Sequence, residues 1–444
     1  MNHYEELLGR LSYVVDEQVG IIKYIIPGVL SSTDPPIHSY ACAMADTRAF
    51  FNHKCNERNG GAGFSYEQAI TATIGEGIER YCAAIYNMDE IVFASWKELK
   101  DRALHPSRWA LFSKKQYNKF KKIGLPYKEF TEDLKVSWVK GWYLVKEESV
   151  YVPAQFVYIP FARQREEVPI GPSISTGMSF GSSLEEAILY GLLENFEREA
   201  LSIWWMQMIP YPNVVIDEDY VEEFLNYFKN VMSPLWIKYL YTEFGIPVIV
   251  IIGVMSVLFP DGKRHHALVM GSAARLSAIK AYRKALLELG QTFPFYRYIA
   301  QSFPKDKQLD RPENIWDFDD HPRWWYLNTE KYINSVKIWV EKGNIKNLSE
   351  LPDYDQNDTF KNLDFLKNLL SEKGYDPVII DLTTPEISDL GFKVVKVMIP
   401  EFVPLEGGHL LRHLGAERLY KVPKNLGYEV FNEDEVNPLP HPSA

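Results

Sequence analysis

Cysteine is scarce in this sequence. Its 444 residues include only three cysteines, an odd count with no C-x-x-C pair, which argues against a disulfide framework and against a cysteine-based zinc site. A reducing cytoplasm is the compartment in which such a chain is expected. The N-terminus also lacks the charged and apolar regions of a signal peptide, so the sequence predicts a cytoplasmic protein.

Long apolar runs and an excess of basic residues are missing as well. The longest apolar run, residues 247–259, is too short to span a bilayer and is rich in Val and Ile, so it predicts a buried strand and no membrane partner. The net charge of −11 argues against nucleic-acid binding, because phosphate backbones are bound by Lys and Arg. An acidic chain can still bind a nucleotide when a metal ion bridges its carboxylates to the phosphates.

Two common nucleotide-binding motifs are absent. The chain contains neither G-x-x-x-x-G-K-[ST] nor G-x-G-x-x-G. His409 and His413 are four residues apart, a spacing that permits metal ligation, but no H-E-x-x-H accompanies them and the pair does not indicate a metal site. Any nucleotide site must therefore be built from other residues.

Strand-like and helix-like segments mix without a strict βαβ alternation, which predicts an α/β or mixed α+β fold with helices packed on sheets. Six segments rich in β-branched and aromatic residues are predicted strands, namely 136–145, 150–156, 248–257, 267–271, 377–382 and 392–399. The segment 305–358 carries many charges together with Trp316, Trp324 and Trp325. We expect it to form surface helices and loops.

Three segments share one pattern, a Gly- or Ser-rich turn followed by a helix with regularly placed Glu, Arg or Gln. The turns are predicted at 59–65, 173–183 and 271–277, and the helices at 66–86, 184–206 and 278–293. Ser65, Ser183 and Ser277 are the predicted N-caps. Glu186 lies three residues after Ser183, which predicts a capping box.

The first two helices carry the same E-x-x-E-R motif. Positions three apart share a helix face, and carboxylates on a mostly apolar helix are costly unless they are paired or bind a metal. One such motif is usually a solvated face worth at most about 1 kcal/mol. Two of them, each after a Gly-rich turn, indicate a site for Mg²⁺ and a nucleotide, with Glu76, Glu79 and Arg80 from one helix and Glu194, Glu197 and Arg198 from the other.

The three helices and the C-terminal end together resemble the YcaO family of ATP-dependent enzymes, which includes azoline-forming cyclodehydratases. The matching segments are 68–81, 177–199, 281–291, 418–423 and a P-x-P-x-P end at 438–442. The resemblance implies a YcaO-type fold around a non-Walker ATP site. It also implies a catalytic domain over 41–444, preceded by an N-terminal extension over 1–40.

The resemblance assigns roles to individual residues. It implies Mg²⁺ ligation by Glu76, Glu79, Glu194 and Glu197. It implies ATP binding by Arg80, Glu194, Arg198, Arg283, Glu288 and Gln291. It implies a catalytic role for Pro438, Pro440 and Pro442 beside ATP. Many members have a lysine where this chain has Ala62, and we expect Lys54 or Arg58 to take its place.

The function implied is that of an ATP-dependent cyclodehydratase. Such an enzyme activates backbone amides of a ribosomally made precursor peptide so that Cys, Ser or Thr side chains cyclise to thiazoline or oxazoline, with release of ADP and phosphate. The implied partners are an E1-like leader-binding protein, a flavin dehydrogenase in the same complex and a second copy of the chain. A thioamide-forming enzyme and an inactive scaffold subunit remain alternatives. The P-x-P-x-P end favours cyclisation, and the intact E-x-x-E-R motifs argue against a scaffold.

Overall fold

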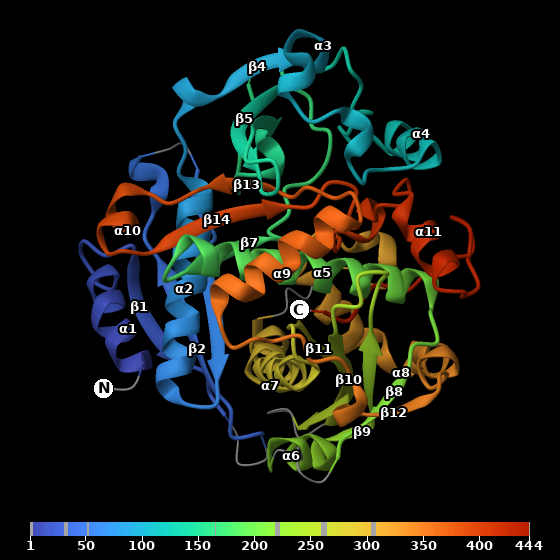
Figure 1. The fold of residues 1–444 in the computed structure, drawn as a ribbon. Coiled ribbons are helices and arrows are strands. Elements are labelled where there is room, and N and C mark those ends of the chain that lie inside the picture. The colour runs from blue at the N-terminus through green and yellow to red at the C-terminus, as the bar shows by residue number, and fades with distance from the viewer. Residues whose placement is uncertain are drawn as a thin grey trace.

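Three β-sheets with helices packed on and between them make up the protein (Figure 1). The computed structural model describes residues 3–30, 34–50, 53–164, 166–217, 223–258, 264–302 and 308–443. Helices and strands mix along the chain without strict alternation, so the predicted mixed α/β class is confirmed. No helix in these described ranges is both long and apolar enough to cross a membrane.

The first sheet is antiparallel and has three strands, β1 (Ile22–Pro27), β2 (His38–Met44) and β3 (Arg58–Gly63). Helix α1 (His3–Leu11) packs against α2 (Tyr66–Ala84), and α2 in turn covers β2 and β3. The predicted boundary at residue 40 therefore falls inside β2, and β1 before it is part of the same sheet.

The second sheet has the strand order β11-β10-β9-β8-β12. Its strands are β8 (Asn213–Val215), β9 (Met232–Leu240), β10 (Val248–Leu258), β11 (Arg264–Ala274) and β12 (Ile345–Asn347). Its helices are α6 (Glu223–Val231), α7 (Ala278–Ser302) and α8 (Asp320–Val340), of which α7 and α8 pack on β11.

The third sheet has the order β4-β5-β13-β14-β7, with β6 paired to β5. Its strands are β4 (Val92–Ser95), β5 (Lys135–Tyr143), β6 (Ser149–Pro153), β7 (Met178–Gly181), β13 (Val378–Asp381) and β14 (Lys393–Met398). The other helices are α3 (Trp96–Leu99), α4 (Lys114–Ile123), α5 (Leu184–Gln207), α9 (Thr359–Glu372), α10 (Pro385–Asp389) and α11 (Arg418–Asn425). Strand β4 with α3 and α4 forms the upper lobe in Figure 1. All six predicted strands are confirmed, with ends shifted by a few residues.

Helix α5 is the central helix, and most of its side chains are buried. Its N-cap is Ser183, whose hydroxyl accepts from the backbone N–H of Glu186, as predicted. The capping box was wrong in its second half, because the Glu186 carboxylate accepts from the N–H and hydroxyl of Ser182 instead of from Ser183. Ser65 caps α2 as predicted.

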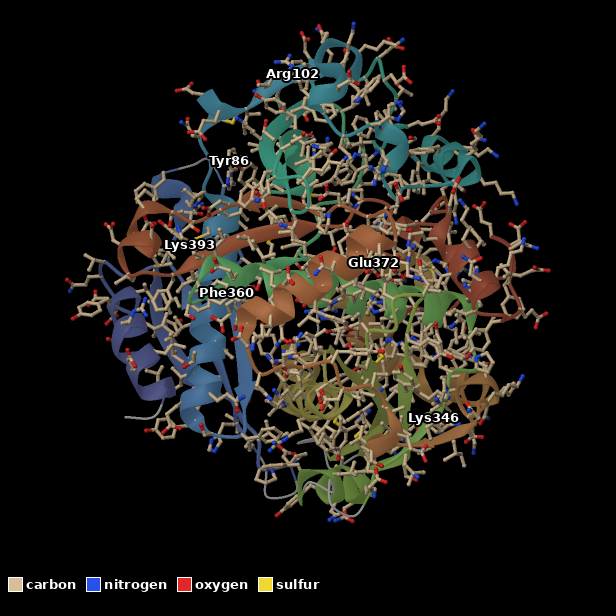
Figure 2. All side chains as sticks on the ribbon, viewed as in Figure 1. Tyr86, Arg102, Lys346, Phe360, Glu372 and Lys393 are labelled. Atoms are coloured by element: carbon tan, nitrogen blue, oxygen red, sulfur yellow. The ribbon has the colours of Figure 1, made fainter. Side chains whose placement is uncertain are left out.

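The segment 305–358, of which residues 305–307 lie outside the described part of the chain, has exposed loops as predicted, but the prediction that its helices lie at the surface was wrong. It contains α8, whose Trp324 and Trp325 are both 0% exposed and lie in the main hydrophobic core. Charged residues on the outer face of α8 masked its apolar face in the sequence. Side chains fill the space between α8, α5 and the sheets (Figure 2).

Candidate functional site

Three helices and three edge strands alternate around one region of the molecule. Strands β3, β7 and β11 each lie at the end of their own sheet. Helix α2 contacts β3 and β7, α5 contacts β7 and β11, and α7 contacts β11 and β3, which closes a ring. The three repeated sequence segments are therefore the three strand–helix units of this ring.

Glycine in these units allows backbone to lie directly on backbone. A Cβ added at Gly61 of β3 would lie 2.4 Å from the backbone nitrogen of Thr73 in α2. A Cβ added at Gly271 of β11 would lie 2.4 Å from the backbone nitrogen of Leu289 in α7. The predicted turns are consequently strands or strand ends, and their glycines are needed for close packing.

The glutamates of α2 bind backbone N–H groups of two edge strands. Glu76 Oε2 accepts from Gly60 N in β3 at 3.2 Å, and Glu79 Oε1 accepts from Phe180 N in β7 at 2.8 Å. An edge strand presents N–H groups without a strand partner. The first E-x-x-E-R motif thus connects α2 to two sheets.

The glutamates of α5 form the matching contacts on the other side. Glu194 Oε2 accepts from the N–H of Gly177, just before β7, at 2.9 Å. Glu197 accepts from Ser272 Oγ at 2.7 Å and from Ala274 N at 3.2 Å, both in β11. All four predicted glutamates therefore line the ring.

The two arginines lie among these carboxylates. Arg198 Nε is 3.6 Å from Glu194 and 3.9 Å from Glu197, and its charge also interacts with those of Glu76 and Glu288, so Arg198 is near all three helices. Arg80 Nη2 is 3.4 Å from Glu76. The Nε atoms of both arginines are buried and have no hydrogen-bond partner among the described residues.

Burial changes the acidity of this cluster. It raises the pKa of Glu79 to about 8, with Arg80 opposing the change and Glu76 and Glu194 adding to it. It also raises the pKa of Glu197, against the opposing charge of Arg198. Like charges held together in a buried site favour protonated carboxyls, and a divalent cation would relieve the same repulsion.

The residues therefore fit a nucleotide with its metal. Two buried guanidinium nitrogens without hydrogen-bond partners among the described residues suit phosphate oxygens, and the four glutamates around the ring supply oxygen atoms of the kind that Mg²⁺ prefers. Within the described ranges, no three His, Cys, Asp or Glu side chains form a ready-made metal cluster, His409 and His413 included. The four-glutamate metal site is not preformed, because each carboxylate is held by a backbone N–H, and its assignment stays a prediction.

Helix α7 places its predicted residues on the remaining side of the ring. Gln291 lies against Gly60, since a Cβ there would be 3.1 Å from its side-chain nitrogen. The Arg283 guanidinium lies 5.7 Å from the centre of the Phe64 ring. Glu288 is paired with Lys284, which together with other cations lowers its pKa although burial alone would raise it.

Neither cation expected to replace the lysine missing at Ala62 reaches this cluster. Lys54 is paired with Glu57, and Arg58 donates to the hydroxyl of Tyr298 at 2.7 Å. Ala62 is itself buried in an apolar cluster, where a lysine would lose its hydration.

Lys396 of β14 is the lysine that sequence reasoning missed. Its Nζ donates to the carbonyl oxygens of Ile174 at 2.5 Å and of Thr176 at 2.7 Å. Burial lowers its pKa to about 7, with Glu194 opposing that change and Arg80 adding to it. A lysine between two valines of a predicted buried strand, Val395 and Val397, was the available signal in the sequence.

The C-terminal end packs inside the protein. Trp205 Nε1 of α5 donates to the carbonyl of Leu439 at 2.9 Å, and Trp325 Nε1 of α8 donates to that of Pro440 at 3.0 Å. Pro440 and Pro442 are buried, whereas Pro438 is exposed. Figure 1 places the C-terminus within the outline of the molecule.

A stacked histidine pair holds the same segment. The rings of His321 and His441 are stacked with 3.7 Å between their centres, and His321 Nδ1 donates to the carbonyl of His441 at 3.1 Å. His441 Nε2 donates to the carbonyl of Glu406 at 2.9 Å. Burial lowers the pKa of His441 most, and the charges of His321 and Arg198 lower it further. The docked C-terminal end therefore lies within electrostatic range of Arg198 in the ring of helices and strands.

Comparison with known proteins agrees with this geometry. A family model described as YcaO cyclodehydratase, ATP- and Mg²⁺-binding, matches residues 60–403. An uncharacterized protein of Methanothermobacter thermautotrophicus is 24% identical over 274 residues, which make up 60% of this chain and 66% of that protein.

Two solved structures share the fold. A heterocyclase in complex with substrate and cofactor has a TM-score of 0.78 at 23% identity, over 99% of this chain and 57% of that chain. The YcaO protein of Methanopyrus kandleri, bound with AMPPCP and Mg²⁺, has a TM-score of 0.62 at 19% identity, over 90% of each chain. This chain thus spans little more than half the length of that heterocyclase.

Proposed function

The chain belongs to the YcaO family, and on that premise we propose that it is an ATP-dependent cyclodehydratase of peptides. The observation that carries the proposal is the ring itself, in which two E-x-x-E-R helices place four carboxylates beside two buried arginine nitrogens that have no hydrogen-bond partner among the described residues. An inactive scaffold would have no need to keep such a costly cluster buried.

ATP and Mg²⁺ are the cofactors of the family. When bound with Mg²⁺, ATP would supply the phosphoryl group that turns an amide oxygen into a good leaving group. Arg80 and Arg198 would hold phosphate oxygens through the Nε atoms that have no hydrogen-bond partner among the described residues. Glu79 and Glu197, whose pKa values are raised by burial, would become ionised as they bind the cation. The ring partly buries these groups, which strengthens their electrostatic contacts.

The buried C-terminal end supports cyclisation as the reaction. We assign Pro438, Pro440 and Pro442 a catalytic role in ordering the reacting groups beside the nucleotide. Stiff proline-rich backbone is placed at small entropic cost. Deleting residues 440–444 should consequently lower cyclisation much more than nucleotide binding, as measured by peptide mass and by nucleotide titration. Equal losses in both would contradict this role.

The substrate in this proposal is a ribosomally made precursor peptide with Cys, Ser or Thr side chains, which become thiazoline or oxazoline. An E1-like protein that captures the leader peptide, a flavin dehydrogenase in the same complex and a second copy of the chain are the proposed partners. If the chain alone bound leader peptide tightly and reached full turnover, the E1-like partner would be unnecessary.

The deciding experiment is the mass of a candidate peptide after incubation with this protein, its E1-like partner, Mg²⁺ and ATP. Loss of one water per modified residue supports cyclisation, and replacement of oxygen by sulfur when sulfide is supplied supports thioamide formation. Glu197→Gln should abolish the change, whereas Glu185→Gln on the same helix should not. An unchanged mass in every condition would refute an amide-activating function.

A further inference from the structure

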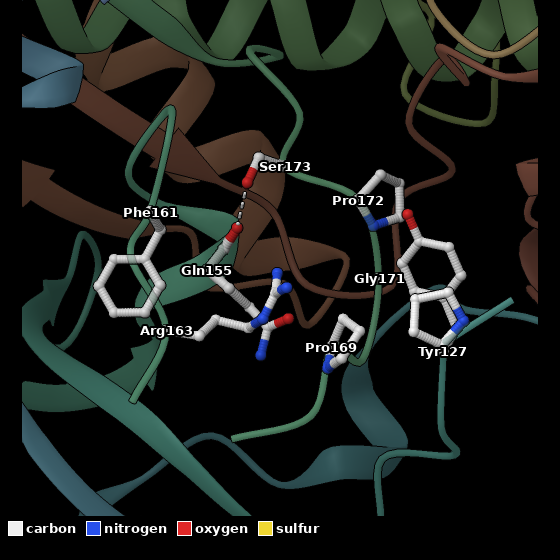
Figure 3. Close-up of a pocket in the computed structure, with 9 residues that line it drawn as sticks. Tyr127, Gln155, Phe161, Arg163, Pro169, Gly171, Pro172 and Ser173 are labelled. Carbon is white, nitrogen blue, oxygen red and sulfur yellow. Dashed lines mark hydrogen bonds between the residues drawn. The ribbon is translucent and has the colours of Figure 1, made fainter. Parts of the chain in front are cut away.

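A polar cavity of about 230 Å³ lies between the upper lobe and the loop that leads to the ring (Figure 3). It is lined by Pro126, Tyr127, Gln155, Phe161, Arg163, Pro169, Gly171, Pro172 and Ser173. None of these residues belongs to the E-x-x-E-R motifs or to the C-terminal end. The cavity is large enough for one or two amino-acid side chains.

Arg163 is the charged residue of this cavity. Its side chain forms no hydrogen bond or ion pair with any residue that the structure describes. Burial raises the pKa of Tyr127, and the charge of Arg163 opposes part of that increase. Figure 3 shows the Arg163 guanidinium reaching in beside Phe161 and Pro169, with Tyr127 and Pro172 on the other side.

The walls of the cavity are held in place by other parts of the fold. Tyr127 makes ring contacts with Phe112 and Phe120 at 5.7 and 5.9 Å. The buried Gln155 side chain accepts from Ile170 N at 3.0 Å, and its backbone carbonyl accepts from Ser173 Oγ at 2.9 Å. The cavity thus offers, on its exposed side, a cation without a hydrogen-bond partner among the described residues, beside walls held by these contacts, which suits a carboxylate ligand.

The loop 171–177 connects this cavity to the ring. Gly171, Pro172 and Ser173 line the cavity, and Lys396 binds the carbonyls at 174 and 176. The loop ends at Gly177, whose N–H donates to Glu194. Because Ser173 and Gly177 are four residues apart, their Cα atoms are at most about 14 Å apart, a span that about four or five residues of an extended peptide cover.

We infer that this cavity binds a carboxylate of the substrate peptide, which lies within about five residues of the amide to be activated. The inference rests on the proposed function, and it adds the acidic character of the substrate near its modified residue. The carboxylate is either an Asp or Glu side chain or the C-terminal carboxylate of the peptide. Both would pair with Arg163 and accept from Tyr127.

The test is a fluorescence-anisotropy titration of the full chain with three labelled peptides of equal length. The first has an internal Glu and an amidated end, the second has Gln and an amidated end, and the third has Gln and a free C-terminal carboxylate. We expect wild-type protein to bind at least one carboxylate peptide about threefold to tenfold more tightly than the Gln amide, since a partly exposed ion pair is screened by solvent. Which carboxylate peptide is preferred identifies the source.

Variants locate the contact. Arg163→Gln should remove the preference. Arg163→Glu should reverse it, so that a fourth labelled peptide, with Lys in place of Glu and an amidated end, binds better than the Glu peptide. Arg102→Gln removes an exposed arginine of the same lobe, labelled in Figure 2, and should leave the preference intact. The reversal by Arg163→Glu also shows that this variant is folded.

Equal affinities for all three peptides in the wild type would overturn the inference, as would equal effects of Arg163→Gln and Arg102→Gln. The titration contains no ATP and requires no dehydration, so it reports on the cavity alone. A carboxylate preference without any ATP-dependent mass change would refute the proposed function but leave the carboxylate site. A mass change without the preference would refute only the carboxylate site.

Discussion

Two adjacent tryptophans of α8 offer a matched test of how the C-terminal end is held. Trp324 and Trp325 are both 0% exposed. Trp325 Nε1 donates to the carbonyl of Pro440 at 3.0 Å, whereas Trp324 Nε1 has no hydrogen-bond partner among the described residues. Phe at either position removes the same atoms from the core, and only Trp325→Phe removes a bond to the C-terminal end.

The difference between the two variants isolates that bond. Each substitution opens a comparable cavity, so the cavity costs largely cancel in the comparison. Trp325→Phe also leaves the buried Pro440 carbonyl without a donor, which costs about 1–3 kcal/mol. Trp324→Phe removes a nitrogen that was already unsatisfied and therefore incurs no such cost. We expect Trp325→Phe to be less stable than Trp324→Phe by about 1–3 kcal/mol.

Urea denaturation measures this difference directly, and digestion by a carboxypeptidase under native conditions measures release of the end. Trp325→Phe should release C-terminal residues faster than Trp324→Phe, and it should lose more cyclisation activity than nucleotide affinity. If the two variants matched each other in stability, digestion and activity, the hydrogen bond would not hold the end in place.

Three substitutions test the ring and its packing, and two others serve as comparisons. Burial raises the pKa of Glu79 from 4.5 to about 8. The stability that Glu79 contributes is therefore complete below pH 4.5 and is lost as the pH rises through 8. In thermal scans without nucleotide, Glu79→Gln should remove this loss of stability. Burial lowers the pKa of Lys396 from 10.5 to about 7, so the wild type should gain stability as the pH rises between these two values. Lys396→Met should abolish this gain, whereas Lys393→Met on the same strand should keep it. Identical pH profiles for the two variants would refute the assignment. Gly61→Ala places a Cβ 2.4 Å from the backbone of α2 and should cost about 1–3 kcal/mol in urea denaturation. Gly9→Ala in α1, with nothing within 4 Å, should instead stabilise the chain by about 0.5–1 kcal/mol.

The sequence pattern of the helices in the ring could be recognised from the sequence alone. Small residues with glutamates at i and i+3 predict helices that are buried and yet carry carboxylates, and the structure places both motifs around one site. Segments rich in β-branched and aromatic residues likewise located some strands of the second and third sheets, namely β5, β6, β10, β11, β13 and β14. These features depend on the periodicity of a single segment, which one sequence shows directly.

Contacts between distant segments were decided only by the tertiary structure. The sequence predicts turns in the Gly-rich stretches, because nothing in 59–63 reveals that helix α2 lies against the backbone of this segment. The sequence predicts that the segment around Trp324 and Trp325 lies at the surface. The core residues that bury it come from α5 and the second sheet, which are distant along the chain. Lys396 is important only because the chain folds Ile174 and Thr176 onto it.

The sequence alone therefore determined which residues carry the charge and the capacity for metal and phosphate binding. The tertiary structure decided which of them meet, which carboxylate binds which edge strand, and that the C-terminal end is enclosed by α5 and α8. The physical reason is that helix and strand periods are local, whereas burial, pKa shifts and unsatisfied polar atoms depend on neighbours that are distant along the chain.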